Sequence, residues 1–82
     1  MSPTVTIRRE SKQRRGKQVT TLSGLAFLGE ERLADLAAAL KRRCATGGTY
    51  EASGTIVLQG DHRDVAQAEI EKLGWVAKRA GG

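Results

Sequence analysis

Six cationic side chains are concentrated in residues 1–17 of this 82-residue chain. Only Glu10 opposes them, so the segment carries five net positive charges, which equals the formal net charge of the whole chain, +5. The run SKQRRGKQ, residues 11–18, contains no apolar side chain, so burial cannot explain it. Arginine forks and lysine ammonium groups are suited to binding phosphates. The chemistry predicted is polyanion binding by Lys12, Arg14, Arg15 and Lys17, with Gly16 as the turn residue among them.

The mode of binding is indicated by the aromatic residues, because none of them lies in this run. Phe27, Tyr50 and Trp75 are the only aromatics in the chain. Stacking of single-stranded bases is therefore disfavoured, and recognition of phosphates and of shape is favoured. The alternative is that the run is simply solvated charge.

Residues suited to catalysis or metal binding are scarce. With one His and one Cys, neither a zinc site nor a Cys–His nucleophile pair is easily assembled. Cys44 falls on an apolar helical stripe and is expected to act as a small buried hydrophobe. His62 is expected at the surface or in a cap, and the spacing of Asp61 and Asp64 is explained by helix capping. We therefore expect no enzymatic activity, no cofactor and no metal.

The elements that position the basic run follow from apolar spacing. Alternation predicts strands over residues 4–8 and 18–23, joined by the basic run as a hairpin loop. Helical spacing predicts a helix over residues 30–44, which Gly47 and Gly48 are expected to end. Three cations fall in its last turn, Lys41, Arg42 and Arg43. Helix C-termini favour cations in any case, so a functional role for these three and a purely structural one both remain open.

The second half of the chain repeats the pattern. Strands are predicted over residues 49–51 and 55–59, with Gly54 taking a positive φ in the turn between them. Gly60 is expected to end the second of these strands in a sharp turn. Asp61 is then the expected N-cap of a second helix, with Asp64 at the third helical position as a weak capping box.

The end of the chain completes the predicted fold. Gly74 is expected to stop the second helix, and residues 75–79 read as a last strand. This order predicts an α+β, two-layer sandwich, in which one mostly antiparallel sheet of about five strands carries both helices on one face. Residues 1–82 are expected to form a single domain, with residues 1–3 and 80–82 flexible.

The cellular setting is inferred from what the chain lacks. No apolar run approaches the roughly 18 residues of a membrane span, and the N-terminus has no signal-peptide pattern. A single cysteine fits a reducing compartment. We therefore expect a cytoplasmic, monomeric protein without membrane contact.

Three segments resemble the translation initiation factor 1 family, small ribosome-binding factors of eukaryotes and archaea with relatives in many bacteria. GTIVLQGDHRD, residues 54–64, resembles the family's strand-to-helix signature. LADLAAALKRRCATGGTY, residues 33–50, is similar to its first helix and the turn that follows. SKQRRGKQVTTLSGL, residues 11–25, is similar to its basic hairpin loop and second strand. The ending WVAKRAGG resembles that of the bacterial members, so the resemblance covers about residues 4–82 in the family's order.

The resemblance implies a function in translation. It implies binding to the small ribosomal subunit near the P site through ribosomal RNA, and help in discriminating start codons and the initiator tRNA. The basic run would reach ribosomal RNA, residues 41–43 would add a contact surface, and Arg63 would contact a phosphate or form an intradomain ion pair. Initiator tRNA and other initiation factors are candidate partners.

Alternatives to a dedicated initiation factor remain open. One is a general RNA-binding protein or a stress-related regulator of translation. Another is an interaction module that docks on an acidic protein.

Overall fold

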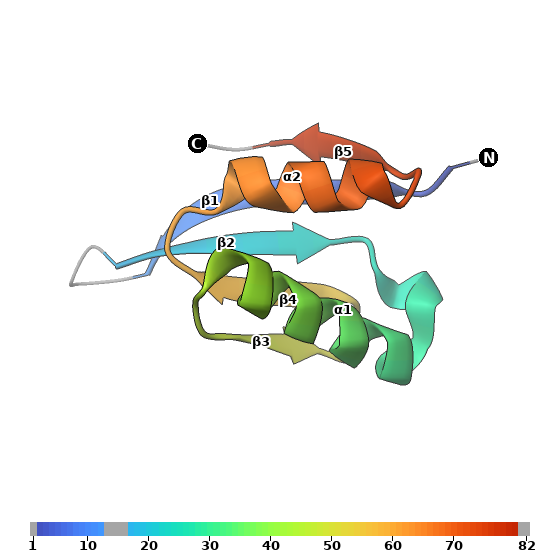
Figure 1. Ribbon diagram of the computed structural model, residues 1–82, viewed down its shortest axis with the longest axis horizontal. Helices are drawn as coiled ribbons and strands as arrows, with labels where there is room; N and C mark the ends of the chain where they lie inside the picture. Colours follow the sequence, from blue (N-terminus) through green and yellow to red (C-terminus); the bar gives the residue numbers. More distant parts are fainter. Residues whose placement is uncertain (1, 13–16, 81–82) are drawn as a thin grey trace.

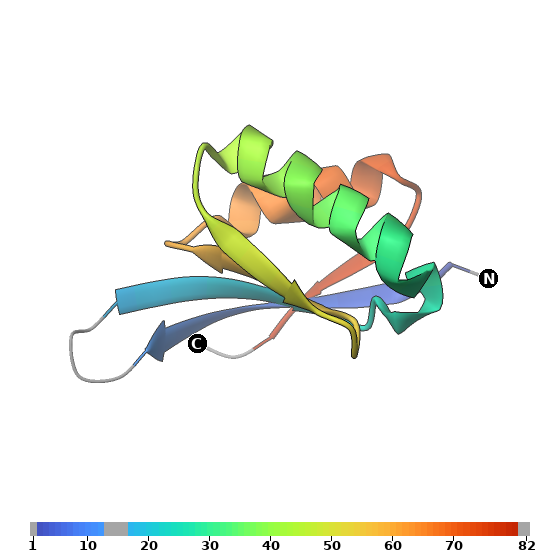
Figure 2. The same cartoon turned by 90° about the horizontal axis from the view of Figure 1, so that it is seen from below.

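The computed structural model describes residues 2–12 and 17–80. Its elements follow the predicted order, with the bounds β1 (Thr4–Lys12), β2 (Lys17–Ser23), α1 (Gly29–Cys44), β3 (Gly48–Glu51), β4 (Thr55–Gln59), α2 (Arg63–Lys72) and β5 (Val76–Arg79). A short 3₁₀ helix, Ala26–Leu28, precedes α1 and was not predicted. Both helices lie on one face of the sheet (Figure 2), which confirms the predicted two-layer α+β sandwich.

The sheet has the strand order β3-β4-β2-β1-β5. All neighbouring pairs are antiparallel except β1 and β5, which are parallel and pair from Thr4 with Val76 to Ile7 with Arg79. α2 therefore carries the chain from β4 past β2 and β1 to the far edge (Figure 1). The sheet is mostly antiparallel, as predicted, with β5 as the exception.

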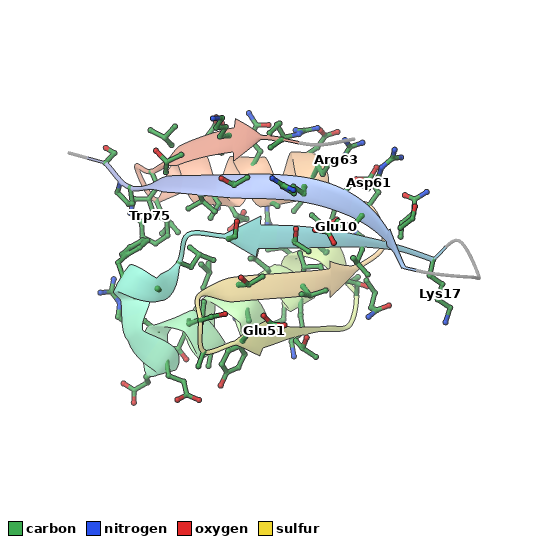
Figure 3. The ribbon with its side chains drawn as sticks, turned by 180° about the vertical axis from the view of Figure 1, so that it is seen from behind. Glu10, Lys17, Glu51, Asp61, Arg63 and Trp75 are labelled. Carbon is green, nitrogen blue, oxygen red and sulfur yellow. The ribbon has the colours of Figure 1, made fainter. Side chains whose placement is uncertain are left out.

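The core lies between the sheet and the two helices. The strands contribute the buried side chains of Val5, Ile7, Leu22, Ile56 and Leu58, and the helices contribute those of Leu33, Ala37, Leu40, Ala66 and Ile70. Because neighbouring side chains in a strand point to opposite faces, the residues between these face away from the helices. Within residues 2–12 and 17–80, no helix covers that second face (Figure 3).

The two strands of the basic hairpin, β1 and β2, extend further than the apolar residues of the sequence indicated. β1 and β2 pair without a break from Thr6 with Ser23 to Lys12 with Lys17. Lys12 and Lys17 are therefore strand residues and not loop residues, which corrects the prediction. The ladder of hydrogen bonds needs only backbone groups, so it continues past the last buried side chain. Arg14, Arg15 and Gly16 lie outside the described residues.

The end of α1 differs from the prediction. Ala45 follows the helix with a φ of 52°, its N–H donates to the Arg42 carbonyl at 3.2 Å, and the Thr46 N–H donates to the Lys41 carbonyl at 3.1 Å. This is a Schellman motif with alanine at the left-handed position that glycine usually takes. Gly47 and Gly48 do not stop the helix: Gly48 begins β3, where a Cβ would lie 2.5 Å from the Val57 carbonyl oxygen.

The start of α2 also differs. The helix begins at Arg63, so His62 and not Asp61 is the N-cap residue, and it makes no side-chain capping bond. Asp64 is then the second helical residue instead of the third, and it pairs with Arg79 instead of closing a capping box.

Three glycines adopt the conformations predicted for them. Gly60, after β4, and Gly74, after α2, have φ values of 89° and 83°. Gly54 has a φ of 104°, and a Cβ there would also collide with the backbone of Ala26. Glycine thus lets the β3–β4 turn pack against the 3₁₀ helix, where the Leu25 N–H donates to the Gly54 carbonyl at 3.0 Å.

Candidate nucleic-acid interface

Several elements meet at one end of the sheet. The ends of β1, β4, α1 and β5 and the starts of β2, β3 and α2 lie together there (Figure 1). The Gly60 N–H donates to the Gln18 carbonyl at 2.8 Å, which fixes the β4–α2 turn beside the start of β2. We call this region the basic end and define it by its described cations, Arg9, Lys17, Lys41, Arg42, Arg43, Arg63 and Arg79.

Three arginines of the basic end are held by carboxylates. The Arg63 guanidinium donates from Nε to Asp61 Oδ1 at 2.8 Å and from Nη2 to Oδ2 at 3.0 Å. Arg79 Nη2 lies 3.1 Å from Asp64 Oδ1, and Arg43 Nε lies 3.1 Å from Glu69 Oε2. These contacts orient the arginines and neutralise part of their charge. For Arg63, the structure shows the intradomain ion pair, one of its two expected roles.

The Arg63–Asp61 pair shifts the pKa of both partners. The hydrogen bond from Arg63 lowers the pKa of the Asp61 carboxyl, and the charge of Arg9 lowers that pKa further. The same hydrogen bond raises the pKa of Arg63. Both groups are therefore charged at neutral pH.

Four cations of the basic end make no ion pair with any described residue. Arg9, Lys17 and Arg42 are exposed, and Lys41 is half-buried. They come from β1, β2 and α1, so they are spread over a surface instead of following one segment. Cations that form no ion pair with the described residues can neutralise phosphates and release their counterions, which is the sequence-independent part of nucleic-acid binding.

A buried threonine fixes the turn beside these cations. Thr20 Oγ1 donates to the Gly60 carbonyl at 2.7 Å and accepts from the His62 N–H at 2.8 Å. Its side chain is fully buried. Next to the turn, Asp61, His62, Arg63, Asp64, Val65 and Arg79 line a polar hollow of about 260 Å³. Thr20 thereby sets where Arg63 and its partner Asp61 lie.

The structure brings together most of the predicted RNA-binding residues. The backbone of Lys12 pairs with Lys17, and residues 41–43 lie at the same end of the sheet as Arg63 (Figure 1). Sequence reasoning missed Arg9, Arg79 and Thr20 as site residues. Continuing the alternation from Ile7 would have placed Arg9 on the helix side of β1. Arg79 depends on β5 lying beside β1, and Thr20 on a turn 40 residues away, so neither has a local signal.

The opposite end of the molecule is acidic. The first turns of α1 carry Glu30, Glu31 and Asp35, the last turn of α2 carries Glu71, and β3 ends with Glu51, against Arg32 and Lys72. Residues 18–82 are neutral in sum, yet the fold sorts their charges between two ends of a molecule that measures 39 × 23 × 22 Å. Figure 3 shows Glu51, the labelled carboxylate of the acidic end, away from Lys17 and Arg63.

Within residues 2–12 and 17–80, no group of three or more His, Cys, Asp or Glu side chains is placed to hold a metal ion. Neither helix in those ranges has the length and hydropathy needed to cross a membrane. Cys44 is half-buried against the core, and burial together with the charge of Glu69 raises the pKa of its thiol.

A two-layer α+β sandwich with cations gathered at one end is typical of a small polyanion-binding domain. Comparison with known proteins gives its family. Residues 1–76 match the family model described as Translation initiation factor SUI1. The chain belongs to the SUI1 family of translation initiation factors, which is a family of translation factors and not of enzymes. The resemblance seen in three sequence segments is thereby confirmed at the level of this family.

Relatives come from bacteria and archaea. The uncharacterized protein YciH of Escherichia coli is 40% identical over 78 residues, which are 95% of this chain and 70% of YciH. An uncharacterized protein of Haemophilus influenzae is 38% identical over 78 residues, 95% of this chain and 72% of that protein. The protein translation factor SUI1 homolog of Methanopyrus kandleri is 49% identical over 63 residues, 76% of this chain and 58% of that protein.

Proposed function

We propose that this protein binds the small ribosomal subunit near its P site through ribosomal RNA and modulates the fidelity of start-codon and initiator-tRNA selection. Membership of a family of translation initiation factors supports a role in initiation. The observation that carries the proposal is the meeting of Arg9, Lys17, Lys41 and Arg42 at one end of the sheet without ion pairs to described residues. The protein acts as a monomeric, non-catalytic factor in the cytoplasm, where initiation takes place.

Phosphate and shape recognition is the mode that the basic end supports. Two of the three aromatic residues, Phe27 and Trp75, form a ring contact at the opposite end, and Tyr50 packs against the core. Base stacking at the basic end therefore has no Phe, Tyr or Trp side chain among the described residues to use. Arg14 and Arg15, in the chain between the paired residues Lys12 and Lys17, are included in the proposed contact for their charge.

We also propose that the protein is one of the bacterial members of the family. The two bacterial relatives align with 95% of the chain, whereas the Methanopyrus kandleri homolog aligns with 76% of it. Its role is then exerted beside the bacterial initiation factors, as a modulator of initiation or as a regulator of translation under stress.

Sedimentation with purified ribosomal particles tests the binding. The protein is mixed with 30S subunits, 50S subunits or 70S ribosomes and centrifuged, with and without excess tRNA. We expect it to sediment with the free 30S subunit only, and excess tRNA to leave that binding intact. Equal binding to 30S and 50S, or displacement by tRNA, would identify a general RNA-binding protein instead. Binding that survives nuclease digestion of the RNA would identify a protein partner.

The fidelity part of the proposal needs its own measurement. Initiation complexes are assembled on two mRNAs that differ only in carrying AUG or a near-cognate start codon. We expect added protein to reduce complexes on the near-cognate codon more than complexes on AUG. An equal effect on both mRNAs would mean that the protein binds the ribosome but takes no part in start-codon selection.

A further inference from the structure

The end of the molecule opposite the basic end carries an apolar groove. The groove measures about 290 Å³ and is lined by Leu28, Leu36, Leu73 and Trp75, with Arg32 and Asp35 adding polar groups. Leu73 is 50% exposed. The Phe27 ring, 51% exposed, stands edge-on to the Trp75 ring at a centroid distance of 5.2 Å and an angle of 79°, and so extends the apolar surface.

The groove is formed where α1 begins and α2 ends. Leu28 closes the 3₁₀ helix before α1, Leu36 lies two turns into α1, and Leu73 and Trp75 flank the glycine that ends α2. Figure 3 shows Trp75 at the end of the molecule away from Lys17, Asp61 and Arg63. Single exposed hydrophobic residues are ordinary, but a half-exposed leucine and an aromatic pair around one groove form a continuous patch. Such patches are typical of the centres of protein–protein interfaces.

The charges around the groove decide what can occupy it. Asp35 lies in its lining, Glu30 and Glu31 precede it on α1, and Glu71 lies in the last turn of α2. Of the two nearby cations, Lys72 is already paired with Glu69 at 3.5 Å, and Arg32, in the lining, is outnumbered by these four carboxylates. An acidic surround repels RNA. It also opposes a symmetric pair of copies, because the two faces of a twofold interface would carry the same net negative charge.

We propose that the apolar groove binds a protein segment that presents apolar side chains flanked by Lys or Arg, as an amphipathic helix with a basic polar face does. Apolar anchors at helical spacing fill such grooves, and the basic flank meets the carboxylates around this one. The inference does not depend on the proposed function. Because the groove and the basic end lie at opposite ends, both can be occupied at once.

Trp75 is the only tryptophan in the chain, so its fluorescence reports on the groove. The probes are three tryptophan-free amphipathic peptides of about 18 residues, or five helical turns. They share one leucine-rich face and differ only in a polar face of Lys, Glu or Gln. We expect the lysine peptide to shift the emission saturably and to bind about tenfold more tightly than the glutamate peptide at low salt, with the glutamine peptide between them.

Two pairs of matched variants locate the binding. Leu73→Ser removes a half-exposed side chain from the groove, while Val76→Ser removes one that is 49% exposed but does not line the groove. Asp35→Lys reverses a carboxylate in the lining, while Glu51→Lys makes the same charge change on β3. We expect Leu73→Ser and Asp35→Lys to weaken the lysine peptide several-fold, and Val76→Ser and Glu51→Lys to leave its affinity unchanged. If circular dichroism shows that Leu73→Ser is unfolded, the comparison of Asp35→Lys with Glu51→Lys decides whether the peptide binds in the groove.

Several results would overturn the proposal. One is that no peptide shifts the Trp75 emission saturably. Others are that the glutamate peptide binds more tightly than the lysine peptide, or that the groove variants and their controls lose equal affinity for the lysine peptide. Sedimentation equilibrium that shows a dimer lost in Leu73→Ser would make a second copy the occupant. An emission shift with an RNA oligonucleotide that Leu73→Ser abolishes would make RNA the occupant. Because no ribosome takes part, failure here leaves the ribosome-binding proposal standing.

Discussion

At the scale of single residues, Thr20 controls the geometry beside the basic end. It is the buried polar residue among those that the structure describes, and its hydroxyl joins the Gly60 carbonyl to the His62 N–H. Thr20→Val keeps the shape but leaves both groups without that partner. We expect the free energy of unfolding to fall by about 1–3 kcal/mol, measured by urea denaturation.

Thr21→Val is the matched control for this prediction. Thr21 is the next residue of β2, it faces away from the helices, and its hydroxyl makes only a 3.4 Å contact to Glu10. We expect its replacement to change stability little, since valine suits a strand. Equal effects of the two substitutions would show that the buried bridge is not what Thr20 contributes.

The Arg63–Asp61 ion pair predicts a pH dependence. The folded-state pKa of Asp61 is lowered from its ordinary value of 3.8, chiefly by the Arg63 hydrogen bond. A carboxyl with a lowered pKa stabilises the fold above the ordinary pKa, and this contribution is lost as the pH falls through the folded-state pKa. Arg63→Met should therefore raise the pKa of Asp61 toward 3.8 in an NMR titration. The difference in melting temperature between the two proteins should shrink in acid. An unmoved pKa would mean that Arg63 does not hold Asp61.

At the scale of elements, the seven main ones could be predicted from the sequence, but several of their ends could not. Apolar spacing located β1 and β2 but not their extent, because residues 9–12 pair through the backbone and contribute no apolar side chain. The N-cap of α2 was predicted one residue early: the His62 carbonyl accepts the first helical hydrogen bond, from the Ala66 N–H, while Asp61 still accepts from the Arg63 N–H at 3.4 Å as well as from its side chain. The parallel pairing of β5 with β1 depends on the path of α2 across the sheet, which no local pattern encodes.

The end of α1 predicts a stabilising substitution. Ala45 takes a left-handed conformation, with φ 52°, that costs a residue with a Cβ about 1–2 kcal/mol, whereas Gly74 holds the corresponding position after α2. Ala45→Gly removes that strain but adds freedom to the unfolded chain. We expect a net gain of about 0.5 kcal/mol in thermal unfolding.

A glycine inside α1 serves as the control. Ala38→Gly has no strain to relieve, so it should cost about 1 kcal/mol through helix propensity. Destabilisation by both substitutions would contradict the Schellman geometry at Ala45.

The apolar stripe of α1 predicts graded losses. Leu40 is fully buried, whereas Leu36 is half-buried and lines the apolar groove. Leu40→Ala should lower the free energy of unfolding by about 2–5 kcal/mol. Leu36→Ala should lower it by less, because a half-buried side chain leaves a smaller enclosed cavity when it is removed. Urea denaturation measures both. A larger loss for Leu36→Ala would contradict the packing of α1 on the sheet.

At the scale of the whole molecule, the fold separates charge that the sequence distributes evenly. Beyond residue 17, cations and anions balance along the chain. In three dimensions the ends of β1, α1 and β5 gather cations, and the start of α1 and the end of α2 gather carboxylates. The basic run could be recognised from the sequence as one part of the candidate site. Lys41 and Arg42 could also be named as candidates, but the meeting of Arg9, Lys41 and Arg42 at one end could not be predicted, because it follows from the strand order and from where each helix begins and ends.

One measurement tests most directly the claim that the basic end binds the small subunit. The affinity of the Lys41→Ala, Arg42→Ala double variant for purified 30S subunits is measured at several salt concentrations. It is compared with the Arg32→Ala, Lys72→Ala variant, which removes the same charge from the acidic end. We predict weaker binding for the first variant only, with the slope of log affinity against log salt shallower by about 1.5 for two lost phosphate contacts. Equal losses in the two variants would contradict the account, because binding would then follow net charge and not the basic end.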